Sequence, residues 1–312
     1  MITVIEAMKA FKAFIFFGIF GLSALNAAER TPEEHRHFKD WCKKHGKKYR
    51  SLEEEEIAME NLLKHKEIVD AHNKEYYEGQ QSFSMGLSDH HDLTLEQLKK
   101  LRGGIKVPPE YESRRSTRAN YPNYPPGPSS IDWNDRGLVG PVRDQAQCGS
   151  CWAFSTAAIV YAVTAKKNRP RTTSPQQLVD CDKTAYTTGC KGGWPENSLD
   201  YVRMYGMASE NEYPYKGYQS QCDYSNEEKV ATVSQVFNIP TRGNETWLKD
   251  IVGSVGPVSI VLCLDESFYY YQHGVYKVNS CCTSHEHAPI ITGYGTDPVE
   301  GDYWIIKNSW GL

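Results

Sequence analysis

The first contrast of hydrophobic and polar positions lies near the N-terminus. An apolar run over residues 13–25 follows Lys9 and Lys12 and precedes the small pair at 27–28, which is the layout of a secretory signal peptide. The run is shorter than the roughly 20 residues that a bilayer-spanning helix needs. We therefore expect residues 1–27 to be a signal peptide, and we expect no membrane span anywhere in the chain.

A charge-rich stretch with helical periodicity extends from Glu29 to about Lys106. Ser, Thr and Pro residues followed by acidic or amide side chains mark the starts of its helices. Thr31 caps the first helix, a capping box at 51–54 opens a second that runs toward Asn73, and Thr94 with Gln97 opens a third.

The next stretch, from Val107 to Ser130, is rich in Pro, Tyr, Ser and Arg, and we interpret it as an exposed, cleavable linker. Beyond it the pattern changes. Helices are predicted at 150–167, after the Ser-Pro cap at 174–175, and over 197–204; short apolar segments at 258–264, 274–278, 288–293 and 303–307 predict strands. A helical lobe beside a β lobe leaves a cleft at their junction.

Composition narrows the class of protein. Hydrophobic residues make up 39% of the 312 residues and the net charge is −4, without a basic stripe, so we expect no nucleic-acid partner. The nine cysteines are typical of an oxidising compartment, where Asn244 in Asn-Glu-Thr becomes a candidate glycosylation site. Because nine is odd, at least one thiol is left over.

Cys151 is the strongest candidate for chemistry because it lies where a helix begins. Unpaired backbone N–H groups there favour a thiolate, which is the nucleophilic form. Cys148 and Cys151 also form a Cys-x-x-Cys pattern, so a thiol–disulfide oxidoreductase is an alternative.

A thiolate nucleophile also needs a proton donor for the leaving group. His287 and Asn308 lie far downstream at strand-like segments, and an amide bonded to the imidazole would fix its tautomer. A zinc site built from Cys281, Cys282, His285 and His287 is the competing interpretation.

The string Cys148-Gly149-Ser150-Cys151-Trp152, with His287 and Asn308 behind it, resembles the papain-like cysteine peptidases. The resemblance implies an α+β fold of two lobes, one helical and one β-barrel-like, with a cleft between them and a helical inhibitory prosegment before them. It implies a signal peptide at 1–27, a prosegment with linker at 28–126, and a peptidase domain at 127–312 whose C-terminus is incomplete.

The resemblance also implies residue roles. Cys151 is the expected nucleophile, His287 the general acid and base, and Asn308 its orienter; Gln145 and the Cys151 N–H are the expected oxyanion donors. The expected substrate-binding residues are Gly192, Gly193, Trp194, Val261, Ala288 and Trp310. The implied disulfides are Cys148–Cys190 and Cys181–Cys222.

The prosegment resembles those of cathepsin L-like peptidases, with Glu54, Leu62, Val69 and Asn73 on the expected helix positions. His65 and His90 stand where that pattern has Asn and Phe. A cysteine endopeptidase made as an inactive zymogen is therefore expected, or alternatively a catalytically impaired relative that acts as a binding protein. The expected partners are peptide substrates, the chain's own prosegment and cystatin-like inhibitors, with a monomer in the lysosome or outside the cell and no cofactor or metal.

Two further expectations concern specificity and activation. Trp194 is bulky for its position, so the S2 pocket is predicted to be narrow and to favour compact P2 side chains. Seven of the ten histidines precede the linker, which suggests that acid releases the prosegment. These seven are His35, His37, His45, His65, His72, His90 and His91.

Overall fold

The computed structural model describes residues 30–109, 111, 124–237, 239, 245–278, 282 and 284–311. The expected signal peptide, the sequon at Asn244, Cys281 and most of the expected linker lie outside these residues. The described chain divides into two compact units, residues 30–48 and residues 49–311. None of the described helices is long and apolar enough to cross a membrane.

The first unit is built on α1 (Pro32–His45). The Thr31 side chain accepts a hydrogen bond from the Glu34 N–H, and the Glu34 carboxylate accepts one from the Thr31 N–H. Both backbone N–H groups at the helix start therefore have a partner. Gly46 ends the helix in the left-handed conformation at φ 64°. The predicted cap at Thr31 is confirmed.

The second unit begins with α2 (Leu52–Tyr77), β1 (Phe83–Met85) and α3 (Leu95–Arg102). The prediction of a capping box at residues 51–54 was wrong. Ser51 does accept from the Glu54 N–H, but the Glu54 carboxylate accepts from the Arg50 N–H instead. Asn73 ties α2 to β1 by two hydrogen bonds of 2.8 Å with the Met85 backbone.

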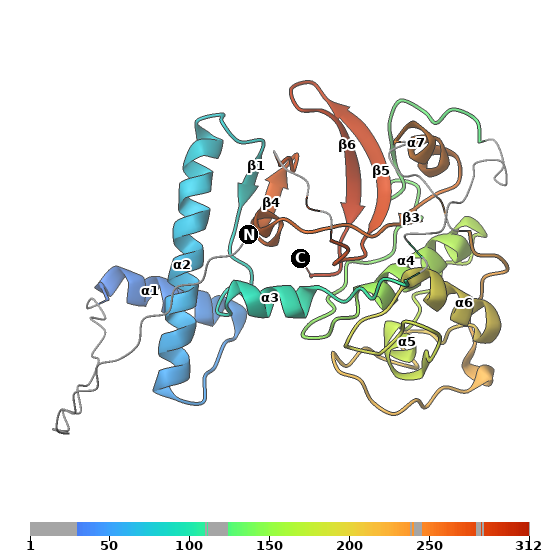
Figure 1. Cartoon of the computed structure of the whole chain (residues 1–312), viewed down its shortest axis with the longest axis horizontal. Coiled ribbons are helices and arrows are strands. Elements are labelled where there is room, and N and C mark those ends of the chain that lie inside the picture. The colour runs from blue at the N-terminus through green and yellow to red at the C-terminus, as the bar shows by residue number, and fades with distance from the viewer. Residues whose placement is uncertain are drawn as a thin grey trace, which may run out of the picture. The chain divides into compact units, whose positions relative to one another are not determined.

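A helical lobe follows, made of α4 (Cys151–Lys166), α5 (Pro175–Cys181) and α6 (Pro195–Tyr205). In Figure 1 these helices lie together in one part of the unit. They enclose an apolar core, which explains why α4 is hydrophobic on nearly all sides. Its fully buried members include Trp152, Val160, Leu178, Val179, Val202 and Met207.

The β lobe is centred on the hairpin of β5 (Ile290–Asp297) and β6 (Gly301–Lys307), the long paired arrows in Figure 1. Strands β2 (Ile131–Asp132) and β3 (Val258–Ser259) pair antiparallel with β5, and α7 (Glu245–Ser254) packs against it. The papain-like arrangement of a helical lobe and a β lobe is thus confirmed.

Two strand predictions differ from the structure. The segment 258–264 forms only the two-residue β3, followed by an isolated bridge from Leu262 to His287. The strand expected at 274–278 is replaced by β4 (Tyr271–Gly274), which pairs antiparallel with β1 of the prosegment region after the short helix η3 (Glu266–Tyr270). A second short helix, η2 (Asn226–Glu228), precedes α7.

Three disulfides link the described residues. Cys148 bonds to Cys190 and Cys181 to Cys222, while Cys263 bonds to Cys282 in the β lobe. Each bond closes a loop of the chain and so reduces the entropy of the unfolded state. Since Cys148 pairs with Cys190, it does not form the bridge with Cys151 that a redox motif requires.

Candidate active site

Cys151 is the first residue of α4, and it is fully buried. The helix cap, Ser150, makes no side-chain hydrogen bond to the first turn. Backbone N–H groups of Cys151, Trp152 and Ala288 instead hydrogen-bond the sulfur and act to lower its pKa, but burial dominates and raises that pKa to about 12. In this state the nucleophile candidate is a neutral thiol.

His287 is also fully buried, and its Nε2 lies 2.6 Å from Asn308 Oδ1. The same oxygen accepts from the Ser309 N–H at 2.8 Å, which identifies it as the amide oxygen. Nε2 therefore carries a proton, which leaves Nδ1 as the basic nitrogen of the neutral ring. Burial lowers the pKa of His287 to about 4.

Two further predicted residues complete this centre. The Trp310 ring lies 4.8 Å from the His287 ring, centroid to centroid. Gln145 is fully buried, and its Oε1 accepts from the Ser309 hydroxyl at 2.7 Å, which fixes the direction of its amide N–H₂ group. Gln145 precedes α4, His287 precedes β5 and Asn308 follows β6. The hydrogen bond from the Ala288 N–H to the Cys151 sulfur links the start of α4 to the residue after His287.

Residues 101–106, the covering segment, occupy this centre. Gln145 Nε2 donates to the backbone carbonyls of Leu101 at 3.3 Å and Arg102 at 3.4 Å, in addition to Cys148. Farther along, the Gly193 N–H donates to the Gly104 carbonyl at 2.9 Å, and the Lys106 N–H donates to the Gly193 carbonyl at 3.0 Å. The donors expected to hold a substrate are therefore bound to this chain's own backbone.

Glycine is required where the two backbones meet. Gly104 has φ +143°, and a Cβ there would lie 2.4 Å from the Gly149 carbonyl oxygen. A Cβ on Gly193 would lie 2.4 Å from the Trp152 ring. The covering segment can lie this close to Gly149 only because Gly104 carries no side chain.

Trp194 and Val261 line one cavity of about 560 Å³ in this state. Tyr111 of the prosegment region packs its ring edge-on against Trp194 at 4.8 Å and against His285 at 5.5 Å. The Tyr111 ring therefore lies beside Trp194 in this state, and the narrow S2 pocket stays a prediction. Ala288 does not line this cavity.

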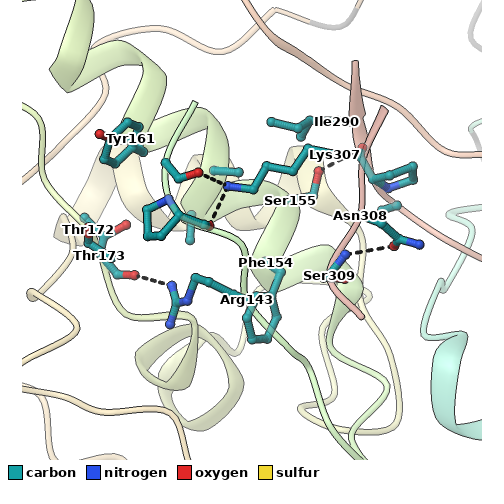
Figure 2. A pocket seen from close by; sticks show the side chains of 16 residues that line it. Arg143, Phe154, Ser155, Tyr161, Thr172, Thr173, Ile290, Lys307, Asn308 and Ser309 are labelled. Carbon is teal, nitrogen blue, oxygen red and sulfur yellow. Dashed lines mark hydrogen bonds between the residues drawn. The ribbon is translucent and has the colours of Figure 1, made fainter. Parts of the chain in front are cut away.

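Ala288 lines a separate small cavity of about 30 Å³ beside Asn308. Figure 2 shows Lys307 reaching across it to the carbonyl oxygens of Gly140 and Pro141, each at 2.8 Å. Burial, followed by the Arg143 charge, lowers the pKa of Lys307 to about 8. Lys307 thereby fastens the end of β6, which carries Asn308, to the loop that leads to Gln145.

Sequence reasoning missed Arg102, Gly104 and Lys307. Arg102 looks like an ordinary basic residue at a helix end, and a Gly-Gly pair after a helix is normally only a cap. Lys307 has no distinguishing local pattern. Their contacts with the peptidase domain come from segments more than 40 positions away, so nothing in the neighbouring residues indicated them.

Comparison with known proteins is consistent with this geometry. Residues 127–312 match the family described as papain family cysteine protease, and residues 38–98 match the cathepsin propeptide inhibitor domain. Cathepsin S of Bos taurus is 36% identical over 91% of this chain and 86% of its own length, and a cathepsin L-like protein of Caenorhabditis elegans is 36% identical over 84% and 78%. The solved structure of digestive procathepsin L 3 from Tenebrio molitor larval midgut has a TM-score of 0.77 at 29% identity and covers 89% of each chain.

Proposed function

Because the chain belongs to the papain family of cysteine proteases, we propose that Cys151 and His287 hydrolyse peptide bonds as a thiolate–imidazolium pair. The cathepsin propeptide inhibitor domain marks the chain as a protease made in zymogen form. The observation that carries the assignment is the His287–Asn308 bond of 2.6 Å, next to a cysteine at a helix start.

The chemistry follows from the positions of these groups. Cys151 Sγ attacks the substrate carbonyl carbon, and the oxyanion that forms accepts hydrogen bonds from the Gln145 amide and the Cys151 N–H. His287 then protonates the departing amine, which leaves an acyl-enzyme. A water molecule, deprotonated by His287, attacks the acyl carbon and regenerates the thiolate. Asn308 keeps the imidazole in the required orientation throughout.

The same groups account for inhibition in the zymogen. With the Gln145 amide bound to prosegment carbonyls and Gly193 paired with Gly104 and Lys106, a substrate has no donors to bind. Both reacting side chains are buried and neutral, so the ion pair is not formed. We propose that it forms when removal of the prosegment admits water to the cleft.

The finer assignments are also proposals. Gly192 and Gly193 would pair with the substrate backbone, while Trp194 and Val261 would line S2, supported by their shared cavity. We propose an endopeptidase that acts as a monomer in the lysosome or outside the cell and is inhibited by cystatin-like proteins. Three disulfides among the described residues favour an oxidising compartment.

Replacing the nucleophile tests the function. We expect Cys151→Ala to abolish hydrolysis of a protein substrate after activation while the zymogen still folds, because the substitution removes a single sulfur atom and leaves the rest of the buried residue in place. Cys42→Ala, in α1 of the other compact unit, is the matched control and should retain hydrolysis. Residual proteolysis in a pure Cys151→Ala preparation would place the nucleophile elsewhere.

A further inference from the structure

Arg102, the last residue of α3, is buried at the catalytic centre rather than exposed at a helix end. Its side chain retains only 4% exposure. Its own carbonyl accepts from the Gln145 amide, so its backbone lies at the expected oxyanion site. A buried guanidinium is costly unless charged or aromatic groups surround it.

The peptidase domain supplies two of those groups. Arg102 Nη1 donates to Asp144 Oδ1 at 3.2 Å, and the guanidinium carbon lies 5.3 Å from the Trp310 ring centroid. The remaining partners belong to the prosegment: Arg102 Nη2 lies 3.0 Å from His90 Nδ1 and 3.7 Å from Asp89 Oδ1. When the prosegment leaves, Asp144 and Trp310 stay behind without a cation.

A third group of the peptidase domain faces the same place. Tyr269 is 92% buried and stacks on Trp310 at 5.5 Å, yet its hydroxyl has no hydrogen-bond partner among the described residues. After burial, the Glu286 charge is the largest effect that raises the pKa of Tyr269, and the Arg102 charge lowers it. The wall around the guanidinium is thus acidic and holds an unused hydroxyl.

The successive contacts of the covering segment show where the residues around the guanidinium lie within the cleft. Gly104 packs on Gly149, beside the nucleophile, and Ile105 pairs with Gly193, on the side of Trp194. Arg102 precedes both residues in the covering segment and lies next to Trp310. The Trp310 side of the cleft receives the leaving group of a substrate whose acyl part lies against Trp194.

We infer that Asp144, Trp310 and Tyr269 form a leaving-group subsite for a basic side chain, and that Arg102 of the prosegment occupies it as an internal substrate mimic. The inference rests on the proposed peptidase function and names a substrate class for it: peptides with arginine at the first or second residue after the scissile bond. Arginine suits this site better than lysine, because a planar guanidinium stacks on an indole while bonding a carboxylate.

Internally quenched peptides test the subsite on the activated protein. The peptides share one acyl side and carry arginine, its neutral isostere citrulline, or glutamate at the first or second leaving-group position, and mass spectrometry confirms the cleaved bond. We expect kcat/KM to be about tenfold higher for arginine than for citrulline, and lowest for glutamate. Equal values for arginine and citrulline at both positions would overturn the inference.

Variants of Asp144 identify the residue responsible. Asp144→Asn keeps an oxygen for the bond that the Ala146 N–H donates to Asp144, so the loop is preserved while the charge is lost. The arginine-to-citrulline ratio should fall to within about twofold in Asp144→Asn and be restored in Asp144→Glu. Asp200→Asn, on the exposed face of α6, is the matched control and should keep the parent ratio. A full ratio in Asp144→Asn would contradict the assignment.

A second measurement needs no variant of the enzyme. Synthetic peptides spanning residues 95–111, with either arginine or citrulline at position 102, are compared as inhibitors of the activated parent protein. We expect citrulline to raise the inhibition constant about tenfold, whereas identical constants would overturn the inference. If no peptide is cleaved at all, and Cys151→Ala matches the parent, the proposed function has failed instead.

Discussion

Cys151 shows how one residue can be chemically competent and yet inactive. Its position at the start of α4 supplies N–H groups that favour a thiolate, but complete burial raises the thiol pKa to about 12. Burial likewise lowers the pKa of His287 to about 4. Desolvation opposes both charges of the ion pair, so covering the site is enough to prevent ionisation.

Thiol reactivity should report this change directly. Because the alkylation rate follows the thiolate fraction, we expect iodoacetamide to modify Cys151 in the intact zymogen at pH 7 at least about a hundredfold more slowly than after activation. Peptide mass mapping of Cys151 at timed intervals measures both rates. Glutathione in the same tube is the control for reagent activity, and equal Cys151 rates before and after activation would contradict the burial argument.

The sequence carries motifs for the expected reacting residues and none for the residues that cover them. Cys151, His287 and Asn308 carry a pattern of spaced motifs that is recognisable without a structure. Arg102 and Asp144 carry none, because their roles depend on contact between segments 42 positions apart. A local pattern encodes what a residue is able to do, whereas burial of a charge depends on which distant segment covers it.

Helices and strands also differ in how well the sequence predicts them. Helix starts were predictable because caps are local: Thr94 accepts from the Gln97 N–H and Gln97 returns the bond, as its sequence indicated. The strand β4 was not predictable in this way, because it pairs with β1, about 190 residues earlier in the chain. Phe83 lies opposite Gly274 in this pair. Strand ends follow from the partner's length, and that information is absent from the segment itself.

At the scale of the covering segment, Gly104 should decide how firmly the prosegment is held. Gly104→Ala places a Cβ within 2.4 Å of the Gly149 carbonyl oxygen and forces an alanine to φ +143°. We expect Gly104→Ala to weaken the contact between the covering segment and the peptidase domain. The zymogen should therefore activate at least about tenfold faster at fixed pH, which corresponds to roughly 1.4 kcal/mol. Time courses of processing on gels measure this rate.

Lys100→Ala provides the matched control for Gly104→Ala. Lys100 lies on the exposed face of α3 and pairs only with Glu96 within the helix, among the contacts described. Its replacement should leave the activation rate near that of the parent. A Gly104→Ala zymogen that activates at the parent rate would show that the close backbone approach does not control prosegment release.

At the scale of the whole molecule, two buried histidines, His65 and His91, join the prosegment to the β lobe. His65 Nδ1 lies 2.6 Å from the Tyr270 hydroxyl, and the His91 ring stacks on the Tyr270 ring at 4.8 Å. His90 lies against Arg102. The His91 Nδ1 atom accepts from the Ser88 N–H at 2.7 Å, so it cannot take a proton without losing that bond. The charges of His65, Arg102 and His90 all act to lower the pKa of His91.

Acid should loosen this contact through His91. Burial, followed by the His65 charge, lowers its pKa from 6.5 to about 3, so the docked state binds fewer protons than the released state below pH 6.5. The free energy of prosegment docking is unaffected above pH 6.5. It becomes less favourable as pH falls below 6.5, by about 3 kcal/mol at pH 4.5. His91→Gln stays neutral and keeps an acceptor for Ser88, so its zymogen should need a pH lower by about half a unit or more for half-maximal activation rate. His273→Gln, exposed on β4, should match the parent. Identical activation profiles for all three proteins would show that another group senses the acid.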